Sequence, residues 1–352
     1  MTENTKAFLE LVRAGLWEKE ARLLQYGKID YNIIMSFAES QGVVGLVTAG
    51  IEHIVDTKVA QEVVLQFIGQ SILIEQRNLA MNNFVANIIE KMRKADINGL
   101  LFKGPGLAQC YERPLWRSCG DVDFFFSKYE YKNAIDFLTP FSSEVFQNAK
   151  FSKSYGLVID DWIVELHGTL RCGLSSKLVR ETDRVQKKVF GEGDVRLLKN
   201  GKTQVFIPGI NSDLFFIFTH FVRHFYHNEF IFRQICDWCR FLWTYKGQID
   251  VDMLEERLVR SNLMSEWRAF AAVVVDHLGM PADVIPLYSD DKIWHMKGDR
   301  IMKFAMEGKT NNKIVSTIAI SRIFPWNTLC FLPAIFLHLN KIKIKERLFG
   351  SQ

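Results

Sequence analysis

The hydrophobic pattern of the chain separates two helical regions from a central region of short apolar runs. From residue 5 to residue 97, apolar residues recur every three or four positions, which predicts amphipathic helices. The longest of these is expected from about Val59 to Lys94, before the turn signal Asn98-Gly99. Beyond Pro208 the helical period returns, with candidate helices at 214–226, 230–245, 251–260 and 264–278.

The central region is predicted to contain strands. Its apolar runs lie at 100–102, 122–126, 153–159, 162–170 and 195–207. Asp160-Asp161 indicates a hairpin turn, and Asn200-Gly201 indicates a candidate pair of strands within the last run. The pattern therefore predicts an α+β fold with a small mixed β-sheet core. We expect that core at 96–210, between an N-terminal helical region, 1–95, and a C-terminal helical domain, 211–352.

Composition narrows the class of protein. Of the 352 residues, 48% are hydrophobic and 24% are charged, a globular balance that argues against disorder. The net charge of +4 gives no support for stable DNA binding. Because we find no signal-peptide core and no run of about 18 apolar residues, we expect a cytoplasmic protein without a transmembrane helix. Cys236 and Cys239 have the spacing of a redox motif or of one half of a zinc site, but no second pair lies nearby, which favours packing in a helix.

The strongest chemical signal is Gly120-Asp121-Val122-Asp123, which leads into three phenylalanines. Side chains two apart on a strand share a face, so Asp121 and Asp123 point the same way. Two carboxylates beside a buried sheet repel each other and resist desolvation, and a divalent cation relieves both effects. Mg²⁺ prefers carboxylate oxygens together with substrate phosphates. The alternative is a solvated strand end that carries two acids.

A second polar strand face lies in the run Trp162-Ile163-Val164-Glu165-Leu166-His167. Ile163, Glu165 and His167 alternate with apolar residues and share one side of the strand. Glu165 is therefore a candidate third carboxylate, which would bind metal or take a proton from an attacking hydroxyl. The alternative is an edge strand with an exposed face.

Lys103-Gly104-Pro105-Gly106 lies at a predicted strand-to-helix turn. Glycines at such a turn let a phosphate approach backbone N–H groups at the start of a helix. The segment has neither the P-loop spacing nor the dinucleotide fingerprint. Its value lies in the order of the features, since a phosphate-type turn precedes a strand that carries two aspartates.

In this order, the motifs resemble the uncharacterised nucleotidyltransferase family, which belongs to the DNA polymerase β-like nucleotidyltransferase superfamily. The resemblance covers roughly residues 30–285. It is carried by Lys103-Gly104, Leu107, Tyr111, Arg117, Gly120-Asp121-Val122-Asp123 and Val164-Glu165-Leu166-His167, followed by His220, His224, Arg233 and Asp237.

The resemblance implies a nucleotidyltransferase core in which Asp121, Asp123 and Glu165 are catalytic and hold Mg²⁺. It further implies an NTP bound by a set of seven residues, Lys103, Gly104, Arg117, Gly120, His167, His220 and Arg233. An acceptor would attack the α-phosphorus and release pyrophosphate. The acceptor stays open and could be a small molecule, a protein side chain or an RNA end.

The chain departs from the superfamily pattern at two positions. No serine follows Gly104, so we expect Lys103 to contribute a point charge to the phosphates instead. Gly168 stands where an aromatic residue is frequent in the family, which predicts a wider or looser site.

Other readings stay open for the C-terminal half. Arg233 and Asp237, four apart, are expected to form an ion pair along one helix. From Asp291 onward the chain carries 11 Lys or Arg and four Asp or Glu. This basic, aromatic tail is expected to cap the helical domain, or to associate weakly with an anionic membrane. Two other functions also remain open, an inactive nucleotide-binding or regulatory protein of the same fold and a peripheral membrane protein.

Overall fold

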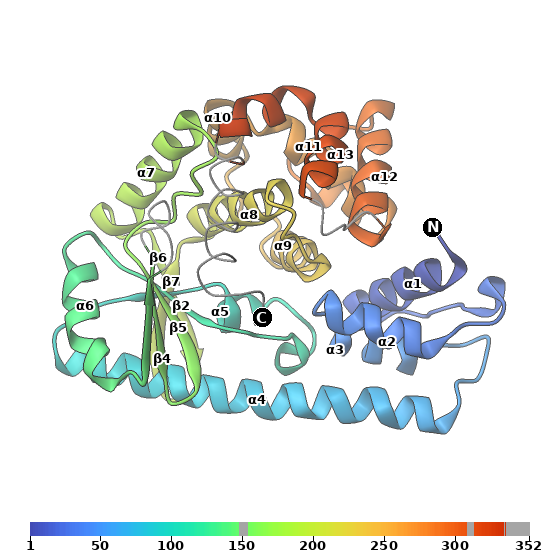
Figure 1. Ribbon diagram of the computed structural model, residues 1–352, viewed down its shortest axis with the longest axis horizontal. Coiled ribbons are helices and arrows are strands. Elements are labelled where there is room, and N and C mark those ends of the chain that lie inside the picture. The colour runs from blue at the N-terminus through green and yellow to red at the C-terminus, as the bar shows by residue number, and fades with distance from the viewer. Residues whose placement is uncertain (148–153, 308–312, 334, 336–352) are drawn as a thin grey trace.

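The computed structural model describes residues 1–147, 154–307, 313–333 and 335 (Figure 1). The N-terminal region is helical, as the apolar period predicts. Three short helices precede one long helix, and their bounds are α1 Glu3–Trp17, α2 Tyr31–Ser40, α3 Val44–Glu52 and α4 Gln61–Lys94. Figure 1 shows α4 running along one side of the molecule, from the N-terminal helices to the sheet.

The main sheet has five strands in the order β1-β2-β5-β4-β3. Their bounds are β1 Leu100–Phe102, β2 Val122–Phe125, β3 Glu144–Gln147, β4 Ser154–Ile159 and β5 Trp162–His167. The central pair β2 and β5 is parallel, and the other pairs are antiparallel. A separate two-stranded sheet is formed by β6 Val195–Asn200 and β7 Thr203–Pro208. The predicted α+β class, with a small mixed sheet between helical regions, is confirmed.

Three helices are interspersed among the strands, with bounds α5 Gly104–Ala108, α6 Glu130–Leu138 and α7 Ser176–Gly191. The hydrophobic pattern predicts α5 and α6 but misses α7 and the edge strand β3. The buried residues of α7 form one narrow stripe along the helix. They are Leu178, Glu181, Thr182, Val185 and Val189. Only three members of that stripe are apolar, in a segment that is otherwise rich in charged residues.

The C-terminal region is a cluster of helices around an aromatic core. Its helices are α8 Ile210–Tyr226, α9 Phe232–Thr244, α10 Val251–Ser261, α11 Met264–Asp276, α12 Lys292–Glu307 and α13 Lys313–Ile323. Residues 325–333 are also helical, and there Phe331 packs edge-to-face on Tyr226 with ring centroids 4.8 Å apart. None of the helices in the described parts of the chain is long and apolar enough to span a lipid bilayer. The lysines expected to form the basic end, after residue 340, lie outside the described residues.

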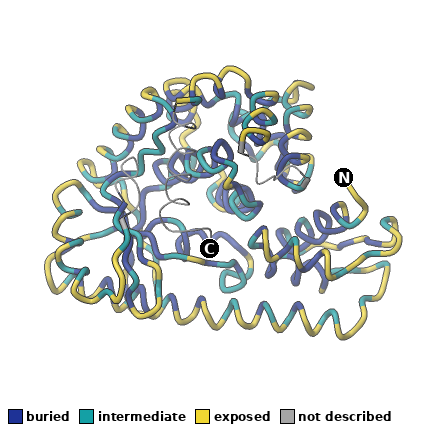
Figure 2. The backbone as a smooth tube through the Cα atoms, in the orientation of Figure 1, coloured by how far each residue is buried: buried dark blue, intermediate teal, exposed yellow. Residues whose placement is uncertain are grey.

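The hydrophobic core unites the N-terminal and C-terminal helices. In α9, Phe232 contacts Phe8 of α1, with ring centroids 6.3 Å apart. Cys236 and Cys239 are buried free thiols inside this core, as their expected packing role requires. A second core lies between the C-terminal half of α4, the main sheet and α6. Figure 2 shows both cores as dark segments, with the outer side of α4 exposed.

Two glycines set the close packing of α1 against α3. A Cβ at Gly50 in α3 would overlap the carbonyl oxygen of Leu11, and a Cβ at Gly15 in α1 would overlap that of Leu46. The backbones of the two helices therefore touch at these points, which fixes their separation.

We expect Gly50→Ala to lower the free energy of unfolding by about 2 kcal/mol or more, because the added methyl group forces the helices apart. Gly69→Ala in α4 is the matched control, since nothing lies within 4 Å of a Cβ there. That change is expected to stabilise the protein by about 1 kcal/mol through helix propensity alone. Urea unfolding measured at low protein concentration compares the two, and equal effects would contradict the packing explanation.

Candidate active site

All ten residues that the sequence predicts for the site line one cavity of about 510 Å³. They come from the turn after β1, the segment before β2, two strands and two helices. The turn after β1 contributes Lys103 and Gly104, and the approach to β2 contributes Arg117, Gly120 and Asp121. The strands β2 and β5 and the helices α8 and α9 supply the other five, which are Asp123, Glu165, His167, His220 and Arg233.

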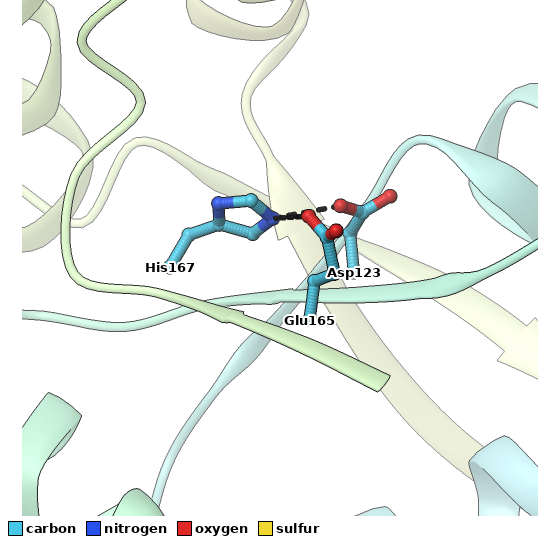
Figure 3. A group of neighbouring side chains, drawn as sticks. All are labelled: Asp123, Glu165 and His167. Atoms are coloured by element: carbon cyan, nitrogen blue, oxygen red, sulfur yellow. Dashed lines mark hydrogen bonds and ion pairs between the residues drawn. The ribbon is translucent and has the colours of Figure 1, made fainter. Parts of the chain in front are cut away.

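The register of the two parallel strands brings the central acids together. Asp123 on β2 lies opposite Glu165 on β5. The Nε2 atom of His167 lies 2.7 Å from Oδ1 of Asp123 and 3.4 Å from Oε2 of Glu165 (Figure 3). One potential ligand atom from each of these residues lies within 4.8 Å of the others, so the group has the size of a metal site.

Asp121 lies on the wall of the same cavity but outside this compact group. Asp121 comes just before β2, so the strand pairing with β5 does not include it. The charge of Asp123, together with burial, raises the pKa of Asp121. The sequence therefore predicts the electrostatic proximity of the two aspartates correctly, but His167 rather than Asp121 completes the closest triad.

Lys103 neutralises the most buried acid of the site. Its Nζ lies 3.1 Å from Oδ2 of Asp123, whose side chain is 1% exposed. Burial alone would raise the pKa of Asp123, but the charge of Lys103 and the hydrogen bond with His167 outweigh it and lower the pKa to about 2. For Glu165, burial and the charge of Asp123 act together and raise the pKa.

The backbone of Lys103 adopts a conformation that favours glycine, with φ 59° and ψ −138°. Such a conformation costs a residue with a side chain about 1–3 kcal/mol. Gly104 follows with φ 38°. The turn is therefore strained at the point where it directs the ammonium group toward Asp123.

Arg117 is locked by a buried ion pair across the cavity wall. It donates from Nε and Nη2 to the two carboxylate oxygens of Asp237, at 2.8 and 2.6 Å. Tyr111 also donates to Asp237, at 2.7 Å. The side chain of Asn78 in α4 donates to the backbone oxygen of Arg117, at 2.8 Å, and so holds the loop in place.

The expected ion pair between Arg233 and Asp237 is not formed. Asp237 is instead bound by Arg117, which donates in parallel from Nε and Nη2 to its two oxygens. Arg233 instead donates from Nη1 to the backbone oxygen of Ser118, at 2.6 Å, and its Nε is buried without a hydrogen-bond partner among the described residues. Its charge therefore faces the cavity without a carboxylate bound to it.

Two further arginines of the cavity wall, Arg171 and Arg223, are not predicted by any sequence pattern. Arg171 is bound by Asp183 of α7, at 2.6 and 2.5 Å. The Nε of Arg223 is buried and has no hydrogen-bond partner within the described ranges. Arginine is common on exposed helix faces. The position of Arg223 directly before His224 on α8 therefore does not predict a place in the cavity wall.

The expectation that Gly168 loosens the site is not supported by its surroundings. A Cβ at Gly168 would meet the ring of Tyr131 in α6 at 2.7 Å. An aromatic ring from another element therefore fills the space beside this position.

Two half-buried histidines of α8 face each other at the cavity, His220 and His224, with ring centroids 4.4 Å apart. Burial, followed by the charge of Lys103, lowers the pKa of His220 well below its usual range. Burial also lowers the pKa of His224. Both rings are therefore neutral in the folded protein at pH 7.

These histidines predict a loss of stability in mild acid. Because the unfolded chain takes up protons below about pH 6.5 more readily than the folded pair, the free energy of unfolding falls as the pH drops below that value, by at most about 1 kcal/mol per pH unit and histidine. The double variant His220→Gln, His224→Gln should flatten the decline in unfolding free energy between pH 7.5 and 5.5.

The control is His295, whose pKa is raised mainly by a hydrogen bond with Asp276. Its stabilisation is present at low pH and is lost as the pH rises, so His295→Gln should steepen the decline. A double variant at 220 and 224 that declines like the wild type would show that the pair does not control this pH range.

The comparisons with known proteins agree with the geometry. The model of the uncharacterised nucleotidyltransferase family matches residues 27–279, which include every element that lines the cavity. No curated protein and no solved structure matches the chain. Because the match covers well over half of the sequence and contains the whole site, the protein belongs to the uncharacterised nucleotidyltransferase family.

Proposed function

We propose that this protein is a Mg²⁺-dependent nucleotidyltransferase that transfers a nucleoside monophosphate from an NTP to an acceptor and releases pyrophosphate. The observation that carries the proposal is the pairing of Asp123 with Glu165 across two parallel strands, at the wall of a cavity that arginines and a lysine also line. The family match supports nucleotidyl transfer in general.

The residues present fit a divalent cation. Asp123 and Glu165 offer carboxylate oxygens, which Mg²⁺ prefers, and Asp121 adds a third acid on the same wall. The pKa of Asp121 is raised chiefly by the charge of Asp123, so the negative charge of the group is not fully compensated by the protein. We assign the cation to Asp123 and Glu165, with Asp121 as the third acid.

When bound there, the cation supplies positive charge that offsets the charge developing on the α-phosphoryl oxygens. The protein's own groups do the rest. Lys103 and Arg233 bind phosphate oxygens, and Gly104 gives them access to the turn backbone. Glu165, whose pKa is raised, takes the proton of the acceptor hydroxyl. The acceptor oxygen bonds to the α-phosphorus as the bond to the β-phosphate oxygen breaks, and pyrophosphate leaves.

We expect Asp123→Asn to lower the rate of Mg²⁺-dependent pyrophosphate release by about 100-fold or more, because it removes a ligand charge that no neighbour replaces. Each of the four NTPs is tested with cell extract as the source of acceptor, under matched protein concentrations. Asp299→Asn is the control, since Asp299 is an exposed acid of α12, far from the cavity lining. Equal rates for Asp123→Asn and the wild type would rule out the assigned site.

The alternative is a nucleotide-binding protein of the same fold that has no turnover. It predicts saturable binding of a labelled NTP that Lys103→Gln and Arg233→Gln weaken, with no pyrophosphate release under any condition. Activity in the first assay excludes this alternative.

Lys103 competes with a cation for Asp123, because its ammonium group already lies beside Oδ2. We expect Lys103→Gln to bind Mn²⁺, a spectroscopic substitute for Mg²⁺, about tenfold more tightly than the wild type in the absence of nucleotide. Electron paramagnetic resonance of free Mn²⁺ measures the difference. Weaker binding by the variant would show that Lys103 supports the cation site instead.

A further inference from the structure

The outer side of α4 is an apolar surface with no covering element among the described residues. Four large side chains lie on it, Leu65, Ile72, Leu73 and Leu79, which are 59%, 46%, 58% and 46% exposed. Figure 2 shows the exposed positions recurring along the side of α4 that faces away from the rest of the molecule. A helix that buries one face against its own fold normally carries polar residues on the opposite, exposed face. A group of large apolar side chains on that exposed face indicates an interaction site.

The exposed positions follow the spacing of a coiled-coil seam. Residues 65, 69, 72, 76, 79 and 83 alternate in steps of four and three, and all six are exposed. This is the a and d pattern of a heptad repeat, written Leu-Gly-Ile-Gln-Leu-Asn along the seam. Leu73 lies beside the middle of the seam. A repeat of 3.5 residues matches another helix that carries the same repeat.

Gly69 has no role within the chain that requires a glycine. A Cβ there would meet nothing within 4 Å, and a glycine in an exposed helix interior costs about 1 kcal/mol relative to alanine. A glycine on a seam does allow a large side chain of a second helix to approach the backbone closely.

The charge of the surface favours a second copy of this chain over other occupants. Among the exposed positions from 65 to 83, Arg77 carries the single charge. That guanidinium lies 5.0 Å from the centre of the Trp162 ring of the same chain. The seam therefore offers no charge to steer a nucleic acid or an anionic membrane, and two copies meet without repulsion.

We propose that the outer face of α4 is a homodimer interface, in which the α4 helices of two copies pack antiparallel around a two-fold axis at residue 74. In this register, Gly69 of one copy lies opposite Leu79 of the other, Ile72 opposite Gln76, and Leu65 opposite Asn83. The small residue thus receives the large one, whereas a parallel pair would set Gly69 against Gly69 and leave a void. The two Leu73 side chains meet near the axis.

The interface is small, since its seam of about 27 Å covers less than the roughly 800 Å² per partner of a standard interface. We therefore expect a weak, reversible dimer with a dissociation constant on the order of 10 µM. Sedimentation velocity of the full chain from 1 to 200 µM should show a shift from monomer to dimer. Leu73→Glu should keep the chain monomeric at 200 µM, because it sets two carboxylates against each other at the axis.

The matched control is Val259→Glu, which changes an equally exposed apolar residue of α10, 62% exposed, and should leave the dimer intact. Unchanged circular dichroism and unfolding midpoints in both variants show that the fold is preserved. A wild type that stays monomeric at 200 µM, or a dimer that persists in Leu73→Glu, would overturn the proposal. So would a monomer that floats with phosphatidylcholine vesicles through the same leucine.

Cysteine cross-linking tests the antiparallel register in a Cys330→Ser background, which removes the exposed native thiol. A bismaleimide should join two copies of Leu73→Cys, and should join Leu65→Cys to Asn83→Cys in a mixture. Leu65→Cys alone should not cross-link, and efficient cross-linking of that variant with itself would contradict the register.

Discussion

The parallel pairing of β2 with β5 is the constraint on which the site depends. It sets Asp123 opposite Glu165 in a sheet that also contributes many apolar residues to a buried core. Two acids so placed repel each other, because the strands fix the separation of their backbones. The chain compensates this repulsion with the charge of Lys103 and with a hydrogen bond between His167 and Asp123.

The rest of the cavity wall places positively charged side chains near these buried acids. The helices α8 and α9 contribute to the cavity wall and have an aromatic core behind them. Arg117 is bound by Asp237 and fixed through Asn78 of α4. Arg223 and Arg233 keep a nitrogen without a partner among the described residues, so they are the cations left to meet an anionic ligand.

Much of this site follows from sequence because strand periodicity and motif order are local properties. Asp123 and Glu165 lie side by side in the sheet as the pattern predicts, whereas Asp121 lies just before its strand. The long helix α4 begins within two residues of the predicted start and ends at the predicted Lys94. The errors concern long-range choices. Whether Asp237 binds Arg233 one turn away or Arg117 from another element depends on which donor geometry is better when both are buried. Helix α7 is not predicted from the apolar pattern, because its buried stripe includes the polar residues Glu181 and Thr182.

The turn at Lys103-Gly104, where the serine of the superfamily pattern is absent, is also a strained part of the backbone. A lysine at φ 59° is unfavourable by itself, and a glycine there would fold more easily. The ion pair with Asp123 offsets this strain only while the carboxylate lacks another cation. In the proposed reaction, a cation bound by Asp123 would release Lys103 toward the phosphates, so that this side chain would serve both groups in turn. The absence of a serine after Gly104 is consistent with the proposal that Lys103 contributes charge at this turn.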